Sequence, residues 1–275
     1  MTWRAIGPSV LSALLALGCV APDEDNTFRD GFELVWSDEF DAVDRSRPDE
    51  QFWEYDIGGN GWGNNQLEFN TDEIENVFVT GDGYLNIVAR EENYGDNYYT
   101  SGRIHTRGNI AMGYGRVEAS VQVPRGIGLW PAFWMLGSDY PGQTWPNCGE
   151  IDILEFKGGE PGTVYSTVHG PGYSGGAGIG ETYSLFGNTF NKTHHTFAIE
   201  REEDYIAWYV DDDLFYELTP DDLPQSKQWV FNGEFFVILN LAVGGHFVRP
   251  PDPSTEFPAT LSVDYVRYYE RDTTP

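Results

Sequence analysis

Residues 149–156 read Gly-Glu-Ile-Asp-Ile-Leu-Glu-Phe, an apolar run that carries three carboxylates. Because the side chains of a β-strand alternate between its two faces, we expect Glu150 and Asp152 on one face and the isoleucines on the other. Glu155 has the wrong parity for the acidic face unless one residue is extra. A β-bulge at residues 153–154 would supply that correction. The stretch therefore predicts a bulged strand with one buried face and one face that carries all three acids.

The two glutamates of this strand are spaced for paired acid chemistry. With the bulge, Glu150 and Glu155 lie about four pleats apart, or roughly 13 Å between their Cα atoms. Two long side chains that lean together can approach the ~5–5.5 Å between nucleophile and acid/base in retaining glycoside hydrolysis. Two other interpretations stay open from the spacing alone: an acidic edge strand that discourages aggregation, or a metal site of three carboxylates.

Aromatic residues flank the acidic strand. Trp145 lies five residues before Glu150, and residues 129–134, Leu-Trp-Pro-Ala-Phe-Trp, come just upstream. Sugar rings present apolar C–H faces that stack on indole rings. Tryptophan beside paired glutamates therefore indicates a glycan cleft.

Residues 145–156 resemble the active-site signature of glycoside hydrolase family 16, in its bacterial laminarinase (endo-β-1,3-glucanase) branch. The spacing of five between the two glutamates is that of the bulged form of the motif, whereas the lichenases of the family typically have four. The other segments that agree follow in the expected order between about residues 32 and 270, and they are residues 34–40, 61–68, 99–104, 167–173, 239–245 and 263–268.

The resemblance implies a fold and a reaction. The fold would be all-β, a two-sheet β-jelly-roll sandwich of the concanavalin-like kind with a concave glycan cleft. The reaction would be hydrolysis of a laminarin-type or mixed-linkage β-glucan by double displacement, with Glu150 as nucleophile and Glu155 as acid/base. Asp152 would hydrogen-bond Glu150 and manage the local charge, so that Glu155 keeps its proton near the working pH.

The resemblance also implies the residues that bind the glucan. They are Asn60, Arg103, Trp130, Trp134, Trp145 and His169. Asn60 and Arg103 would contact sugar hydroxyls, the tryptophans would stack on sugar rings, and His169 would reach the leaving-group side near Glu155. Each has a structural alternative, because large aromatics usually lie in cores, and an arginine or a histidine can serve only as a salt bridge or a satisfied structural residue.

A structural calcium ion is a further implication of the resemblance. Its ligands would be Glu39 and Asp264, helped by a backbone carbonyl near Gly83, because calcium prefers hard oxygen ligands. Such an ion would tie the two chain ends together without taking part in catalysis. The alternative is that each carboxylate caps a turn.

The chain departs from the family pattern at one place. Residues 246–251 read His-Phe-Val-Arg-Pro-Pro, where laminarinases often have Asn-Trp-Pro-Gly after the two glycines. Loss of that tryptophan changes a cleft edge, and with it the number of sugar subsites and the tolerance for branches. The acid pair is untouched.

Composition narrows the partners. The 275 residues include 16 Lys+Arg and 44 Asp+Glu, for a net charge of −28. Such a surface repels nucleic acid and anionic membranes, and it favours a neutral β-glucan over a sulfated galactan, although solubility alone also explains it. A galactan-cleaving relative (agarose or carrageenan), a non-catalytic glucan-recognition protein and a transglycosylase remain alternatives.

The chain divides into three segments. Residues 1–19 have a basic start and a short apolar run that ends in Leu-Ala-Leu-Gly-Cys, typical of a lipoprotein signal peptide with Cys19 as the lipidated residue. Residues 20–31 form an acidic tether, and residues 32–271 form a single catalytic domain. We expect an exported monomer that touches the membrane only through its lipid anchor at the bacterial cell surface or outer membrane. An ordinary signal peptide and secretion are the alternative.

Two features of the sequence remain, the second cysteine and the pattern of short strands. Cys148 has no disulfide partner if Cys19 is lipidated, and we expect a small buried residue. Short strands without βα alternation predict a two-sheet sandwich, joined in one place by a hairpin turn at residues 211–213. The predicted strands are 84–90, 115–123, 150–156, 196–200, 205–210, 235–241 and 261–269.

Overall fold

The computed structural model describes residue 29 and residues 31–272. The predicted signal peptide with Cys19, and most of the predicted tether, lie outside the described residues. Within this part of the chain, seventeen β-strands account for the regular structure, apart from the 3₁₀ helices η1 (Gly175–Ala177) and η2 (Pro220–Asp222). No helix in the described part is long and apolar enough to span a membrane.

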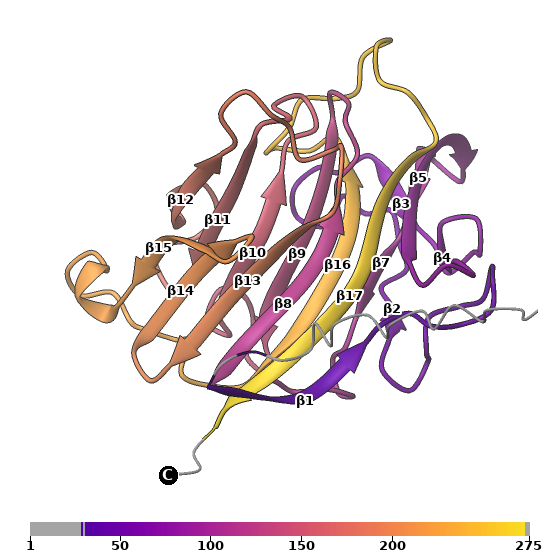
Figure 1. Ribbon diagram of the computed structural model, residues 1–275. Helices are drawn as coiled ribbons and strands as arrows, with labels where there is room; N and C mark the ends of the chain where they lie inside the picture. The colour runs from indigo at the N-terminus through magenta and orange to yellow at the C-terminus, as the bar shows by residue number, and fades with distance from the viewer. Residues whose placement is uncertain (1–28, 30, 273–275) are drawn as a thin grey trace, which may run out of the picture.

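The strands form two sheets packed face to face (Figure 1), which confirms the predicted all-β sandwich of the jelly-roll kind. The larger sheet has ten strands, in the order β15 (Asp213–Leu218), β14 (Tyr205–Val210), β13 (His195–Glu202), β8 (Gly115–Gln122), β17 (Ala259–Arg271), β5 (Leu85–Tyr94), β6 (Asn97–Ser101) and β3 (Glu68–Asn70), with β1 (Phe32–Asp38) beside β17 and β4 (Val77–Val79) beside β5. The smaller sheet has seven strands, in the order β12 (Ile179–Ser184), β11 (Thr163–His169), β10 (Glu150–Phe156), β9 (Leu129–Gly137), β16 (Phe235–Val243), β7 (Arg103–His105) and β2 (Glu54–Tyr55).

The hydrophobic core lies between the sheets. One continuous cluster includes Phe133 and Ile151 from the smaller sheet and Trp208 from the larger one, each with no exposed surface. Full burial of such a side chain stabilises the fold by about 1.5–3 kcal/mol. The smaller sheet therefore has one face that is fixed by the core and another that is free to carry function.

The predicted strands agree with the observed ones in position, and some of them differ at their ends. β10 and β14 have the predicted bounds. The turn after β14 is a hairpin in which Asp211 and Asp212 adopt left-handed backbone conformations, with φ of 49° and 67°. β5 runs four residues beyond the predicted end, to Tyr94, because its polar end pairs with β6. Pairing with a neighbour extends a strand where hydrophobic alternation has already stopped.

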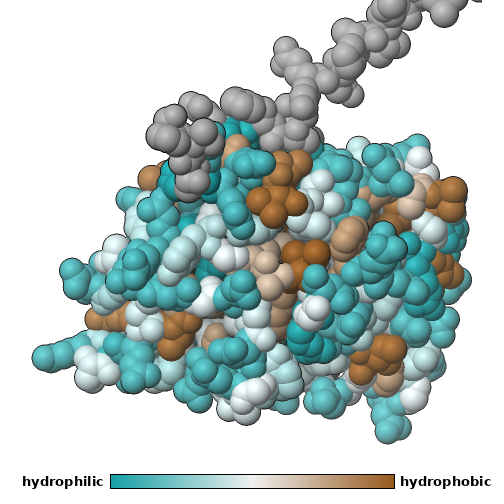
Figure 2. Space-filling view, turned by 90° about the horizontal axis from the view of Figure 1, so that it is seen from below, coloured by the Kyte–Doolittle hydropathy of each residue, from teal (hydrophilic) through white to brown (hydrophobic). Residues whose placement is uncertain are grey.

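Hydrophilic side chains predominate on the face of the molecule shown in Figure 2, with hydrophobic residues in scattered patches. This surface is consistent with the strongly negative net charge. Cys148 is buried and free, as expected, and burial raises the pKa of its thiol to about 11. It is therefore a packing residue and not a reactive one.

Candidate active site

The predicted bulge is present in β10. The pairing register of β10 shifts between Asp152 and Glu155 against β11, and between Asp152 and Leu154 against β9. Ile153 and Leu154 are consecutive residues that both belong to the core between the sheets. This extra residue restores the parity of the strand, so that Glu150, Asp152 and Glu155 all line the same cleft.

Side chains satisfy the backbone carbonyls at the bulge. The indole nitrogen of Trp208, on β14 of the opposite sheet, donates a hydrogen bond to the carbonyl of Asp152 at 3.0 Å. The hydroxyl of Ser166, on β11, donates to the carbonyl of Ile153 at 2.8 Å. Because a buried carbonyl without a partner is costly, these two donors allow the strand to hold its irregular geometry.

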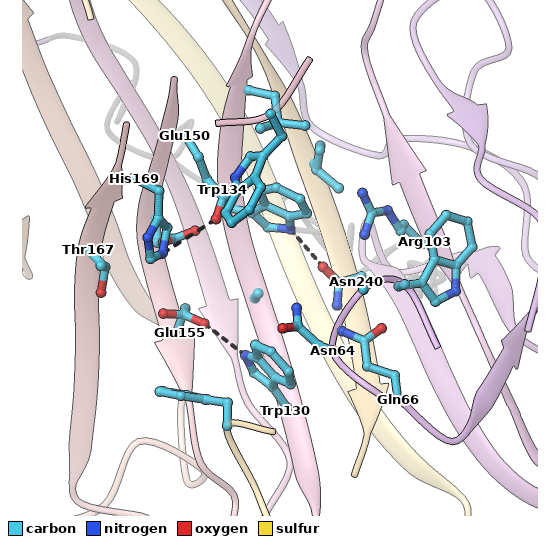
Figure 3. A pocket seen from close by; sticks show the side chains of 18 of the residues that line it. Asn64, Gln66, Arg103, Trp130, Trp134, Glu150, Glu155, Thr167, His169 and Asn240 are labelled. Atoms are coloured by element: carbon cyan, nitrogen blue, oxygen red, sulfur yellow. Dashed lines mark hydrogen bonds and ion pairs between the residues drawn. The ribbon is translucent and has the colours of Figure 1, made fainter. Parts of the chain in front are cut away.

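The cleft is a cavity of about 980 Å³ over the exposed face of the smaller sheet. Its walls come from β9, β10, β11 and β16, and from the loop of residues 58–66 (Figure 3). Every residue predicted to bind glucan lines it, and these are Asn60, Arg103, Trp130, Trp134, Trp145 and His169. The structure therefore brings all nine predicted catalytic and glucan-binding residues into one cavity.

Glu155 is held by a tryptophan. The indole nitrogen of Trp130 donates a hydrogen bond to Oε1 of Glu155 at 3.0 Å. Burial raises the pKa of Glu155, and the neighbouring Asp152 carboxylate raises it further. A carboxyl group that stays protonated near neutral pH can act as a general acid, and the hydrogen bond from Trp130 leaves its other oxygen free to carry the transferable proton.

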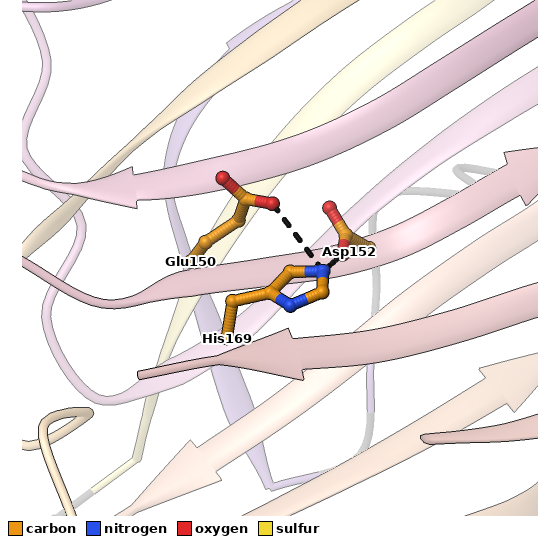
Figure 4. A group of neighbouring side chains, drawn as sticks. All are labelled: Glu150, Asp152 and His169. Carbon is orange, nitrogen blue, oxygen red and sulfur yellow. Dashed lines mark ion pairs between the residues drawn. The ribbon is translucent and has the colours of Figure 1, made fainter. Parts of the chain in front are cut away.

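Glu150 and Asp152 share a histidine (Figure 4). The Nε2 atom of His169, on β11, lies 3.6 Å from Oε1 of Glu150 and 3.3 Å from Oδ2 of Asp152. Burial raises the pKa of both carboxyls, the charge of Asp152 adds to the effect on Glu150, and the charge of His169 opposes it. His169 was expected near Glu155: its ion-pair contacts are with Glu150 and Asp152, and its charge also lowers the pKa of Glu155.

This group also bears on the alternative of a metal site. Ligand atoms of Glu150, Asp152 and His169 lie within 4.8 Å of one another, and Glu155 is not part of the group. The three carboxylates therefore do not converge on a single point, as a metal site built from all three would require. Two carboxylates and a histidine instead form a small cluster of ion-paired side chains beside Glu155.

Arg103 lines the cleft and contacts two aromatic rings and one carboxylate. Its guanidinium lies 4.8 Å from the ring centroid of Trp62 on one side and 4.8 Å from that of Trp134 on the other. Its Nε donates to Asp56 at 2.9 Å. Burial alone would raise the pKa of Asp56, but the hydrogen bond from His105 and the charge of Arg103 lower it to about 2. The planar cation is therefore fixed between two rings by a permanent anion.

Comparison with known proteins identifies the family. A model described as glycosyl hydrolases family 16 matches residues 62–235, more than half of the chain. This chain belongs to family 16. A beta-glucanase from Rhodothermus marinus is 41% identical over 269 residues, which cover 94% of this chain and 92% of the relative.

Solved structures of family 16 proteins agree in fold. The catalytic domain of an endo-1,3-beta-glucanase (laminarinase) from Thermotoga petrophila RKU-1 has a TM-score of 0.83 and 45% identity, and the match covers 88% of this chain and 98% of that one. An endo-beta-1,3-glucanase from Pyrococcus furiosus has a TM-score of 0.83 and 43% identity, with 87% and 95% covered.

Several residues of this family 16 cleft were missed from the sequence. They are Asp56, Trp62, Asn64, Gln66, Arg107 and Asn240. Asn240 carried a readable signal, since it is the polar residue in the middle of an apolar strand, and its Oδ1 accepts a hydrogen bond from Trp134 at 2.7 Å. Trp62 carried a weaker one, between two glycines in a loop, where it adopts a left-handed φ of 48°.

The segment that departs from the family pattern forms part of the cleft edge. The backbone nitrogen of His246 donates to the carbonyl of Asn64 at 2.8 Å, which ties this segment to the loop of residues 58–66. The ring of Phe247 lies 5.0 Å from that of Trp130. An aromatic side chain therefore stands in the segment where the family tryptophan was expected, and it packs on the residue that holds Glu155.

The residues predicted to bind calcium fit the ion only in part. The Glu39 carboxylate is ion-paired with Arg267, at 2.9 Å to Nε and 2.8 Å to Nη2. The carbonyl oxygen of Glu39 lies close to Gly83, because a Cβ atom added to that glycine would be 3.8 Å from it and 3.4 Å from Oδ1 of Asp41. Asp264 accepts a hydrogen bond from Ser120 at 3.3 Å. The donors left for calcium are main-chain oxygens at Glu39 and Gly83 and the side chain of Asp264.

Proposed function

We propose that this family 16 protein is a retaining endo-hydrolase of β-1,3-glucan, of the laminarin or mixed-linkage type. One observation carries the proposal: Glu150 and Glu155 stand on the same face of a bulged strand, in an aromatic-lined cleft, each with its own partner. His169 attends Glu150 and Trp130 attends Glu155. A pair of carboxyl groups on the same face of one cleft is what a double displacement needs.

The proposed reaction has two steps. Glu150 attacks the anomeric carbon and forms a glycosyl-enzyme, while Glu155 gives its proton to the departing oxygen. Glu155, now a carboxylate, accepts a proton from water as the water attacks the intermediate and restores Glu150. In both steps, Asp152 and His169 set the electrostatic environment of the Glu150 side chain. Trp62, Trp134 and Arg103 line the cleft, where the indole rings can contact neutral sugar rings.

The test is reducing-sugar release from laminarin, barley β-glucan, agarose and carrageenan, with Glu150→Gln as control. We expect rapid release from laminarin, near-complete loss in the variant, and a mixture of oligosaccharides as early products, which marks endo action. Proton NMR of the first product should show the β-anomer. Activity on a galactan alone would overturn the substrate, and laminarin binding without cleavage would overturn catalysis.

We propose, on the family resemblance and the partial fit described above, that calcium binds at Glu39, Gly83 and Asp264 as a structural ion. The Glu39 carboxylate would stay with Arg267 and its carbonyl oxygen would face the ion. We expect EGTA to lower the Tm of the protein and Asp264→Asn to abolish that response. A Tm that is the same with EGTA and with added calcium would overturn the site.

We also propose that the protein is an exported monomer anchored through lipidated Cys19. The support is the sequence of residues 1–19, which lie outside the described residues. Mass spectrometry of protein from the membrane fraction should find a diacylglyceryl group on Cys19, and Cys19→Ser should release the protein from the membrane. Sedimentation of the released protein at the mass of a dimer would overturn the monomer.

A further inference from the structure

Lys157 lies just beyond the end of β10, two residues after Glu155. It is one of only three lysines in the chain, with Lys192 and Lys227. Its Nζ atom lies 4.3 Å from the ring centroid of Tyr165 and 4.4 Å from that of Phe247. It forms no ion pair with a carboxylate in the described part of the chain. The ammonium group is therefore held by two aromatic rings and is not neutralised by a direct partner.

Both rings lead to the acid/base. Tyr165 is the residue directly opposite Glu155 on β11. Phe247 packs on Trp130 at 5.0 Å, and Trp130 donates the hydrogen bond to Glu155. The two rings also contact each other edge to face at 5.3 Å. Lys157 is thus fixed on the same side of the strand as Glu155, by residues that contact or oppose it.

The charges around Glu155 give Lys157 a specific effect. After burial, the Asp152 carboxylate raises the pKa of Glu155, whereas the charges of His169 and Lys157 lower it. The other titratable groups nearby are Glu150 on the same strand, Tyr165 with its partner Glu160 on the far side, and His246 beside Phe247. A positive charge next to a carboxyl group favours its ionised form.

We propose that Lys157, held against the rings of Tyr165 and Phe247, is a positioning residue for Glu155. Its fixed charge stabilises the carboxylate that forms as the proton of Glu155 passes to the departing oxygen, while the glycosidic bond breaks and the bond to Glu150 forms. Lys157 does not line the cleft and so acts through Glu155 and not on the substrate. This inference rests on the proposed function.

The test is the pH dependence of kcat/KM on laminarin for the wild type, Lys157→Met and Lys157→Arg. Lys157→Met removes the charge and keeps the length, so Glu155 should become a weaker acid. We expect the alkaline limb to move up by about half a unit to one unit and kcat to fall several-fold, with recovery in Lys157→Arg. Phe247→Leu removes one of the two rings that hold the ammonium group of Lys157, and it should shift the alkaline limb of the pH profile in the same direction.

Lys192→Met is the matched control, because Lys192 is exposed and donates to Asn188 at 3.2 Å. Its profile should overlay that of the wild type. Lys157→Gln serves as a second neutral variant if Lys157→Met has an altered Tm. An unshifted alkaline limb in a folded, active neutral variant overturns this inference alone, whereas a wild type inactive on every glucan overturns the proposed function beneath it.

Discussion

The indole nitrogen of Trp208 donates a hydrogen bond to the carbonyl of Asp152 across the core, 3.0 Å away. This contact joins the larger sheet to the bulge that places Glu155 in the cleft. It makes the active-site strand depend on the packing of the two sheets, and not only on its own neighbours β9 and β11. The two glutamates are therefore positioned by the larger sheet across the core as well as by the neighbouring strands β9 and β11.

Trp208→Phe removes that donor and keeps an aromatic ring. A buried carbonyl then lacks its partner, so we expect a loss of about 1–3 kcal/mol in the free energy of unfolding and a lower kcat, because Glu155 is less well placed. Urea unfolding and laminarin kinetics measure the two effects. Trp229→Phe is the control, since its indole bonds Asn232 near the surface. An unchanged kcat in Trp208→Phe would show that this hydrogen bond to the bulge is not needed for catalysis.

The pH profile should report the raised pKa of Glu155. Burial, and then Asp152, raise this pKa to about 8, so Glu155 keeps its proton at neutral pH and loses it as the pH rises further. We expect kcat/KM on laminarin to fall on the alkaline side near that value. A 2,4-dinitrophenyl glucoside oligomer, whose leaving group needs no proton, should lack this limb. An alkaline limb in the range of an ordinary carboxyl group would contradict the assignment.

Arg103→Lys should weaken substrate binding more than chemistry. Lysine keeps the charge but loses the planar stack between Trp62 and Trp134 and the Nε–H bond to Asp56. A loss of ~1–2 kcal/mol corresponds to a KM raised about tenfold, with kcat largely retained. The equivalent change at Arg47, which lies over Tyr55 outside the cleft, should leave both constants as they are. A fall in kcat at constant KM would place Arg103 in the chemical step.

Glu68→Gln should stabilise the protein at alkaline pH. Glu68 has no exposed surface, Oε2 accepts from the backbone nitrogen of Val243, and Oε1 has no hydrogen-bond partner among the described residues. Burial raises the pKa of this carboxyl from 4.5 to about 8. The unfolded chain therefore releases its proton at lower pH than the folded one, and stability falls as the pH rises from 4.5 to about 8.

The glutamine variant lacks this titration. Its Tm should match that of the wild type near pH 4.5 and exceed it by several degrees near pH 8. Glu118→Gln is the contrasting control, because Glu118 is equally buried but ion-paired with Arg29 and Arg116. Its loss removes the buried carboxylate that contacts Arg116 at 2.8 Å and should lower the Tm at each pH. Parallel Tm curves for wild type and Glu68→Gln would show that Glu68 is ionised in the folded protein.

Local parity was sufficient to predict the bulged strand that carries the three acids. Glu155 could share a face with Glu150 only if one residue was extra, and the structure has that residue at Ile153 and Leu154. The aromatic residues around the motif were likewise predicted as a group. Both inferences depend on neighbours within a few residues, where backbone geometry leaves few choices.

Long-range contacts were beyond the reach of the sequence. The donor to Asp152 comes from Trp208, 56 residues away on another sheet, and nothing local to either residue indicates the pair. Nothing local to Lys157 indicates its contact with Phe247, a residue of a distant loop whose ring centroid lies 4.4 Å from Nζ. The loop of residues 58–66 depends on left-handed residues such as Trp62, which propensity disfavours.

The stacked arrangement of Trp62, Arg103 and Trp134 has a thermodynamic consequence. These side chains hold one another in place, so the protein loses little conformational freedom when a sugar chain enters. The entropy cost of binding then falls mainly on the glucan. A chain that is already ordered in solution should bind more tightly per glucose than a flexible one, and calorimetry should show that difference in the entropy of binding.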